Sequence, residues 1–360
     1  MKRILFLSLF FIGRPALAQQ AENMIIITTD GLRWQELFMG MDSAIANNPA
    51  FNQRDSAYIF SNYWSENASE RRKKLMPFFW SGIEQQGQIY GNRLHGNFVN
   101  NSNPYWFSYP GYSEIFTGFP DEKINSNEHP DNPHKTILEF LNEQEAFKGK
   151  LAAFTAWHAF NRILAESRAG FPVIAAYDTV PGKDLSAEQK LLNTMLLNSH
   201  RPWKSSECLD MFTHYSAMDY LKNKKPKVLY IGYGETDEWA HAGQYRFYLD
   251  AARQFDSWVR EIWEYLQSQP QYRNKTALLI TTDHGRGDKV KKQWTDHGSK
   301  VSGADEIWLA LIAPGVAAKG ELKINLQIYQ KQFAQTIARL LGQTYSASHP
   351  IGEPVNEIWK

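Results

Sequence analysis

The sequence lacks the features that mark several specialised protein classes. It contains a single cysteine, Cys208, so no disulfide can form within the chain. The formal net charge is +1 and the basic residues are scattered, which gives no indication of a nucleic-acid-binding surface. Internal repeats and low-complexity linkers are also missing. We therefore expect neither a disulfide-stabilised scaffold nor a nucleic-acid-binding module.

Long apolar runs are missing too, apart from residues 4–13 near the N-terminus. This run follows Lys2-Arg3 and precedes Ala16-Leu17-Ala18, which is the layout of a secretory signal peptide. The run is too short to span a membrane. The sequence has no cysteine near the cleavage site, so a lipid anchor there has no support. We predict that residues 1–18 are a signal peptide and that residues 19–360 are exported, to the periplasm or outside the cell, with no membrane anchor after cleavage.

The chain has the composition of a globular protein, with 43% hydrophobic and 14% aromatic residues. Short β-branched, apolar runs predict strands at residues 24–29, 88–93, 151–157, 172–177, 227–231, 278–282 and 307–312. Between them, helices are predicted at residues 32–38, 73–86, 136–144, 244–267 and 326–341, whereas residues 41–72 are polar and predict loops. This alternation predicts an α/β fold, a three-layer α/β/α sandwich with a mostly parallel central sheet.

One segment, residues 178–225, differs from the rest of the predicted catalytic domain. It contains two helical stretches, residues 186–199 and 207–221, joined by a polar turn. We expect this segment to form a small inserted or covering lobe.

Residues that bind metals follow several of the predicted strands. In an open α/β sheet, function gathers just beyond the carboxyl ends of the strands. Each residue taken alone has an ordinary explanation, such as a helix N-cap for an aspartate or a surface pair for Asp and His four residues apart. Together they indicate a metal centre. The candidate ligands are Asp30, Asp237, His241, Asp283, His284 and His297.

A serine, Ser108, ends an aromatic extended segment, and a helix is predicted from about Pro110-Gly111. A serine at a helix N-terminus lies near free backbone N–H groups and the positive end of the helix dipole. This environment suits a nucleophile that also holds an anion, although an N-cap serine is the ordinary alternative. With Ser108 there are seven candidate ligands, enough for two cations. Two cations about 4 Å apart form a clamp for in-line displacement at phosphorus, and mixed Asp and His ligands favour zinc, with manganese as the alternative.

The order and context of these residues resemble those of the alkaline phosphatase superfamily, and most closely its phosphatase and nucleotide pyrophosphatase/phosphodiesterase branch. The resemblance covers essentially the mature chain, with residues 178–225 the least supported part. It implies that Ser108 is the nucleophile and is bound, with Asp30, Asp283 and His284, to one metal. The second metal would be bound by Asp237, His241 and His297.

The resemblance also implies a side-chain amide that holds a phosphoryl oxygen. Asn125 and Asn127 both qualify, and Asn125 is preferred here. Arg286 is close in sequence to the ligands and is a candidate for substrate contact, although an ion-pair partner is its ordinary role.

The expected function is therefore that of an exported two-metal hydrolase that cleaves small-molecule phosphate esters through a phosphoserine intermediate. A sulfatase of the same fold is one alternative, but Tyr112 stands where the serine-x-proline-x-arginine modification motif needs arginine. A non-catalytic secreted binding protein is another. Monoester and diester substrates both stay open, and the aromatic side chains between Tyr105 and Tyr112 are candidates for a pocket that would accept a second substituent.

Overall fold

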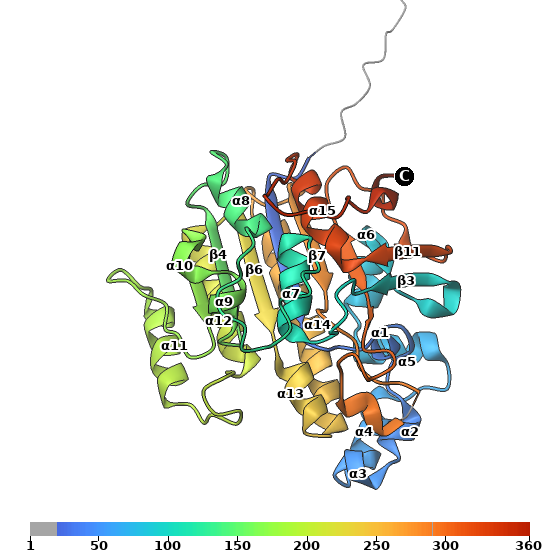
Figure 1. Cartoon of the computed structure of the whole chain (residues 1–360). Coiled ribbons are helices and arrows are strands. Elements are labelled where there is room, and N and C mark those ends of the chain that lie inside the picture. The colour runs from blue at the N-terminus through green and yellow to red at the C-terminus, as the bar shows by residue number, and fades with distance from the viewer. Residues whose placement is uncertain (1–19, 290) are drawn as a thin grey trace, which may run out of the picture.

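A central sheet of eight strands organises the part of the chain that the computed structural model describes, residues 20–289 and 291–360 (Figure 1). The predicted signal peptide, residues 1–18, lies outside these residues. In spatial order the strands are β10 (Gly320–Glu321), β2 (Gln88–Tyr90), β9 (Leu309–Ile312), β7 (Thr276–Thr281), β1 (Asn23–Thr29), β6 (Val228–Tyr233), β4 (Leu151–Thr155) and β5 (Val173–Ala175). The strands from β7 to β5 in this order are parallel, whereas β9 is antiparallel to both of its neighbours. The predicted, mostly parallel α/β sheet is confirmed.

Helices cover both faces of the sheet, which is why its central strands are apolar on both sides. In β1, Met24 and Ile26 pack into one core, whereas Ile25 and Ile27 pack into the other. The first core includes side chains of α7 (Ser108–Thr117), α8 (Ile137–Glu143), α9 (Phe160–Ile163) and α15 (Phe333–Leu340). The second includes side chains of α1 (Trp34–Met39), α12 (Asp210–Lys224) and α14 (Tyr245–Ser268). The three-layer sandwich is therefore confirmed.

The register of β1 brings three strand ends to one edge of the sheet. Thr29 pairs with Tyr233 of β6, and Thr28 pairs with Thr281 of β7. The residues that follow these strands therefore leave the sheet at nearly the same height. This alignment is what places the candidate ligands near one another.

The loops predicted over residues 41–72 are wrong, because four short helices lie there: α2 (Ser43–Ala46), α3 (Pro49–Asn52), α4 (Ser56–Tyr63) and α5 (Ala68–Leu75). Three of the polar residues that suggested loops are helix caps. The side chains of Asp42, Asn48 and Asn67 accept hydrogen bonds from backbone N–H groups at the starts of α2, α3 and α5. Asn and Asp favour both loops and caps, so composition alone cannot separate the two.

Two predicted helices differ from the observed ones. The helix predicted at 73–86 is interrupted next to Pro77, between α5 and the π-helical η1 (Phe79–Ile83), which continues into α6 (Glu84–Gln86). The helix predicted at 326–341 begins only at Phe333. The residues before it form β11 (Leu326–Tyr329), which joins β3 (Asn97–Asn100) and β8 (Glu306–Ile307) in a second sheet that was not predicted.

The segment 178–225 contains α11 (Ala187–Asn198) and most of α12. Ala217, Met218 and Leu221 of α12 lie in the second core, so this helix is part of the layer that covers the sheet. α11 packs against α12 at one side of the molecule (Figure 1). A separate lobe with the predicted boundaries stays a prediction. Within the described residues, no helix is both long enough and apolar enough to cross a membrane.

A buried carboxylate ties the second helical layer to η1. Both oxygens of Asp256 in α14 accept hydrogen bonds, from the backbone N–H groups of Phe78 and Phe79, each at 2.8 Å. Asp256→Ala would leave two buried donors without an acceptor, and we expect it to lower the free energy of unfolding by about 2–4 kcal/mol. Urea denaturation measures this loss. Glu264→Ala removes an exposed carboxylate from the same helix and should change stability by less than about 0.5 kcal/mol.

Candidate functional site

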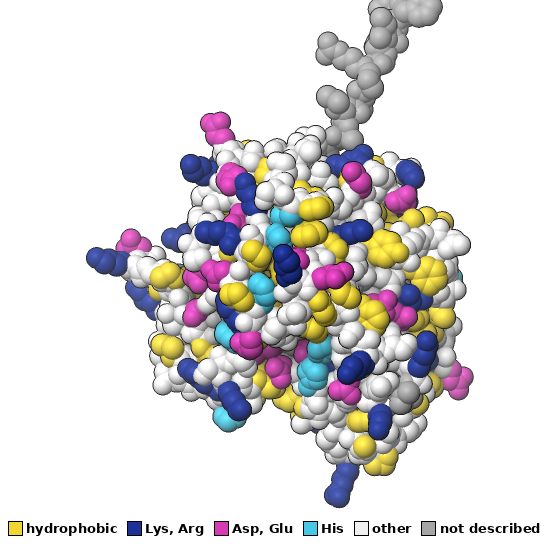
Figure 2. Space-filling model, viewed as in Figure 1, with side chains coloured by type: hydrophobic (Ala, Val, Ile, Leu, Met, Phe, Trp, Pro, Cys, Tyr) yellow, Lys and Arg dark blue, Asp and Glu magenta, His cyan; other side chains and the backbone are white. Residues whose placement is uncertain are grey.

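The candidate ligands leave three neighbouring strands at one edge of the sheet. Asp30 follows β1, and Asp283 and His284 follow β7. Asp237 and His241 lie on α13 (Glu235–His241), which follows β6. Asp30 is not a helix N-cap, because α1 begins at Trp34 and is preceded by Arg33. On the face shown in Figure 2, histidine and acidic side chains occur together below α7, whereas elsewhere basic and acidic side chains are interspersed.

One group of ligands is buried at the ends of β1 and β7. Asp30, Asp283 and His284 each offer a ligand atom, and these atoms lie within 4.8 Å of one another. Nε2 of His284 is 3.2 Å from Oδ1 of Asp30 and 3.5 Å from Oδ2 of Asp283. Oγ of Ser108 is 3.4 Å from the same ring nitrogen. The structure therefore brings the predicted nucleophile against the first group.

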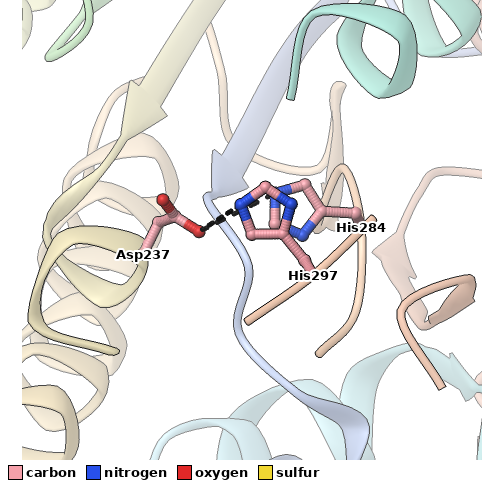
Figure 3. Close-up of side chains that lie close together, drawn as sticks. All are labelled: Asp237, His284 and His297. Carbon is pink, nitrogen blue, oxygen red and sulfur yellow. Dashed lines mark ion pairs between the residues drawn. The ribbon is translucent and has the colours of Figure 1, made fainter. Parts of the chain in front are cut away.

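A second group lies beside it and reaches the surface. Nε2 of His241 is 3.1 Å from Oδ2 of Asp237 and 2.9 Å from Nε2 of His297. Asp237, His284 and His297 also converge, with ligand atoms within 4.8 Å of one another (Figure 3). Oδ1 of Asp237 lies 3.7 Å from Nε2 of both His284 and His297. The two groups thus adjoin, with His284 between them.

Several observations show that these residues fit divalent cations. Among the described residues, Oδ1 of Asp30 and Oδ2 of Asp283 are buried without a hydrogen-bond partner. Buried polar atoms of this kind are rare unless another ligand satisfies them. His241 and His297 face each other through ring nitrogens, an arrangement typical of two ligands of one ion.

Gly31 keeps the space between the two groups open. Its φ of +58° is a conformation that glycine adopts without strain. A Cβ at this position would lie 2.8 Å from Oδ1 of Asp237, 2.9 Å from Nε of Arg286 and 3.1 Å from Cε1 of His284. The glycine is therefore required by the centre itself and not only by the turn after β1.

The charges of the cluster are strongly perturbed. Burial and the neighbouring charge of Asp237 raise the pKa of Asp30, and burial and Asp30 raise the pKa of Asp283 well above its ordinary value. Burial lowers the pKa of His284, but the carboxylates of Asp283 and Asp30 outweigh this and raise it to about 9. Carboxylates crowded in a buried site favour the binding of positive charge.

Arg286 supports the ligand Asp237. Its guanidinium is fully buried, pairs with Oδ1 of Asp237 and donates to the backbone carbonyls of Asp237 at 3.1 Å and Thr295 at 2.6 Å. Although burial acts in the opposite direction, Arg286 and His241 hold the pKa of Asp237 well below its ordinary value. These contacts show that Arg286 orients the candidate metal ligand Asp237. Contact between Arg286 and substrate stays a prediction.

Other residues that hold the ligands had not been identified from the sequence. The hydroxyl of Tyr112 donates to Oδ2 of Asp30 at 3.1 Å. The side-chain amides of Asn101 and Gln330 donate to the backbone carbonyl of Asp283, at 2.6 and 2.8 Å. The position of Gly31 directly after a candidate ligand could have indicated its role. Asn101 and Gln330 come from distant segments, and nothing in the sequence indicates that they contact Asp283.

The nucleophile candidate is the first residue of α7, two residues earlier than the predicted start of this helix. The N–H of the second residue, Tyr109, donates to Oδ1 of Asn127 at 2.9 Å. Asn125 is exposed, and no hydrogen bond of its side chain is found within the described chain. The structure therefore brings Asn127, and not the preferred Asn125, to the end of α7 that carries Ser108. The assignment of either amide to substrate stays a prediction.

The aromatic side chains around Ser108 divide into two sets. Tyr109 and Tyr112 are fully buried in the core and cannot line an open pocket. Tyr105, Trp106 and Phe107 are partly exposed just before the nucleophile. Only this second set is available to contact a substrate.

Comparisons with known proteins agree with this arrangement. A family model described as the Metalloenzyme superfamily matches residues 203–336, a region that contains five of the candidate ligands. The solved structure of the wild-type alkaline phosphatase PafA matches with a TM-score of 0.60 at 12% identity, covering 95% of this chain and 99% of that one. These structural matches show that the chain has the fold of the alkaline phosphatases and sulfatases, and residues 203–336 resemble the Metalloenzyme superfamily.

Other similar structures of this fold carry different activities. BT1596, a 2-O GAG sulfatase, matches with a TM-score of 0.60 at 14% identity, covering 95% of this chain and 74% of that one. The lipoteichoic acid synthase LtaP from Listeria monocytogenes matches with a TM-score of 0.56 at 13% identity, covering 91% and 74%. A search of curated proteins found no match. The family-model match supports a metal-dependent enzyme, and the phosphatases and sulfatases among the similar structures leave the type of ester undetermined.

Metal removal tests the cluster directly. We expect the purified protein to contain near-stoichiometric divalent metal and a chelator to lower its Tm by at least about 4 °C, because buried carboxylates would lose their counter-charge. Elemental analysis and differential scanning fluorimetry measure the two effects. An unchanged Tm together with absence of metal would contradict the metal centre.

A glycine substitution tests the geometry of the site. Gly31→Ala places a Cβ among Asp237, His284 and Arg286, and we expect it to raise the Kd for the metal at least about tenfold, which corresponds to about 1.4 kcal/mol of binding free energy and lowers the metal content of the protein in a competing chelator. Gly149→Ala is a matched control, because Gly149 has a φ of +69° and no atom within 4 Å of the added Cβ. The control should show a similar backbone strain and a normal metal content.

Proposed function

We propose that this protein is an exported hydrolase that uses two divalent cations to cleave phosphate esters through a phosphoserine intermediate. The observation that carries the proposal is the position of Ser108 Oγ, 3.4 Å from Nε2 of His284 at the junction of the two ligand groups. Ser108 is buried, with 6% of its surface exposed. A buried hydroxyl next to metal ligands is the arrangement expected of an activated nucleophile.

The two ligand groups would hold one cation each. Asp30, Asp283 and His284 would share theirs with Ser108, and Asp237, His241 and His297 would hold the other. Zinc is the preferred ion, because each group combines carboxylate oxygen with imidazole nitrogen. When bound, such cations lower the pKa of a hydroxyl and neutralise the charge of a phosphoryl group.

The residues of the chain supply position and orientation. Ser108 Oγ would attack phosphorus and displace the alcohol, and water would then hydrolyse the phosphoserine. Because Oδ1 of Asn127 accepts the Tyr109 N–H, the NH₂ group of this amide is directed away from that N–H and is available to donate to a phosphoryl oxygen. The N-terminal end of α7 adds a favourable potential for an anion.

A sulfatase is the second candidate, since BT1596 has the same fold. The sequence argues against it at Tyr112. This residue occupies the arginine position of the modification motif and is fully buried with its hydroxyl on Asp30. We therefore favour a serine that stays unmodified and phosphate esters as the substrates.

Replacement of the nucleophile gives the decisive test. With p-nitrophenyl phosphate and bis-p-nitrophenyl phosphate as substrates, we expect Ser108→Ala to lower kcat at least about 10³-fold, with the metal still bound. Ser113→Ala is the matched control, because Ser113 is a buried serine of the same helix whose hydroxyl accepts from Asn132. This control should retain activity within about threefold.

The choice of substrate separates the remaining possibilities. Faster hydrolysis of the diester would indicate that Tyr105, Trp106 and Phe107 contact the second substituent. Turnover of p-nitrophenyl sulfate above that of both phosphate esters would overturn the preference for phosphate. Undiminished turnover by Ser108→Ala would overturn the nucleophile assignment.

A further inference from the structure

The loop between α7 and α8 carries Asn127 and is hydrogen-bonded to one helix on each side. On one side, α7 donates the Tyr109 N–H to Oδ1 of Asn127 and the Tyr109 hydroxyl to the carbonyl of Pro130, at 2.9 and 2.7 Å. On the other side lies α9, which carries Arg162. The carbonyl of Arg162 accepts from the N–H of Asn132 at 2.8 Å.

The guanidinium of Arg162 grips the backbone of this loop at two points. Its Nη1 donates to the carbonyl of His129 at 2.7 Å, and its Nη2 donates to the carbonyl of Asn127 at 3.1 Å. The same group lies 3.5 Å from the carboxylate of Glu128, but that side chain is 83% exposed, so the ion pair contributes little. The main contacts of Arg162 are therefore with backbone carbonyls.

We propose that Arg162 is a positioning residue that fixes the Asn127 amide beside Ser108. The inference rests on the proposed function, in which this amide holds a phosphoryl oxygen. Arg162 fixes the main chain of Asn127 and Tyr109 fixes its side-chain oxygen, so the direction of the NH₂ group is determined from both ends. Both contacts are needed to fix the orientation of the Asn127 amide.

The guanidinium of Arg162 donates to backbone carbonyls of the loop, including that of Asn127 itself. Arg162 therefore acts on the substrate only through Asn127. A donor misplaced by about 1 Å can cost a hundredfold in rate, because stabilisation of developing charge depends on orientation. Arg162 should therefore affect kcat through Asn127 and leave metal binding unchanged.

Hydrolysis kinetics and hydrogen exchange test the inference on the metal-loaded protein. We expect Arg162→Ala to lower kcat/KM for the better phosphate ester by about 10- to 100-fold. It should weaken inhibition by orthovanadate by a similar factor, with unchanged metal content. Arg162→Lys, which can reach one carbonyl but not span both, should be intermediate. Amide exchange in peptides covering residues 125–132 should become faster in Arg162→Ala.

Arg168→Ala is a matched control on the adjoining helix α10 (Glu166–Ala169). Arg168 also donates to a backbone carbonyl, that of His134 at 2.7 Å, and pairs with a carboxylate, that of Glu139 at 2.8 Å. These contacts lie beyond the loop that holds Asn127. The control should therefore lose some stability and keep its activity within about threefold.

A double-mutant cycle separates positioning from a general loss of structure. In the Asn127→Ala background, Arg162→Ala should lower kcat/KM by less than about twofold, because the amide that it orients is gone. An equal loss in both backgrounds, or unchanged exchange in residues 125–132, would overturn the inference. If the wild type hydrolyses no phosphate ester, the proposed function fails, whereas the exchange measurement still decides whether Arg162 fixes the loop.

Discussion

The dominant constraint in this structure is electrostatic. Asp30, Asp237 and Asp283 bring three carboxylates into one buried space at the ends of three adjacent parallel strands. In a medium of low polarity such a cluster is unfavourable unless positive charge is built into it or bound by it. Arg286 supplies one permanent positive charge, on Asp237. Oδ1 of Asp30 and Oδ2 of Asp283 have no hydrogen-bond partner among the described residues and share the nearby Nε2 of His284, which is why the cluster is best understood as the frame of a metal centre.

The rest of the site follows from what must come close to that frame. The backbone of α7 has to pack closely against Asp283 so that the hydroxyl of Ser108 reaches the carboxylates. Gly111 permits this, because a Cβ there would lie 2.6 Å from the carbonyl of Asp283. Gly31 meets the same requirement from β1. The two glycines and the hydroxyl of Tyr112 show that the centre depends as much on close approach of main chain as on the choice of ligands.

The fold, and the gathering of the candidate ligands at one edge of the sheet, were predictable because most of the evidence for them is local in the sequence. Asp30, Asp283 and His284 directly follow apolar runs that form buried strands. Asp237 and His241 lie on the helix after such a strand, and His297 follows no strand directly. The capped helices between residues 43 and 75 were not predictable from composition, because asparagine favours caps and loops for the same reason. The preference for Asn125 over Asn127 also had no local basis. The two are separated only by the contact of Asn127 with Tyr109, which depends on how the loop folds back on α7. Likewise, the sequence position of Arg286 does not reveal that its side chain turns inward to Asp237.

The pairing of β1 has a consequence for how the chain acquires its structure. The first strand to be synthesised lies between β6 and β7, and the N–H of Gly31 donates to a carboxylate 252 residues further along the chain. Contacts of such long range form late, since the intervening chain must first be made and its ends brought together. The ligand cluster can therefore assemble only after β7 and Asp283 have been synthesised. A chain interrupted before β7 would contain Asp30, Ser108 and Asp237 but would lack Asp283 and His284, so the first ligand group could not form.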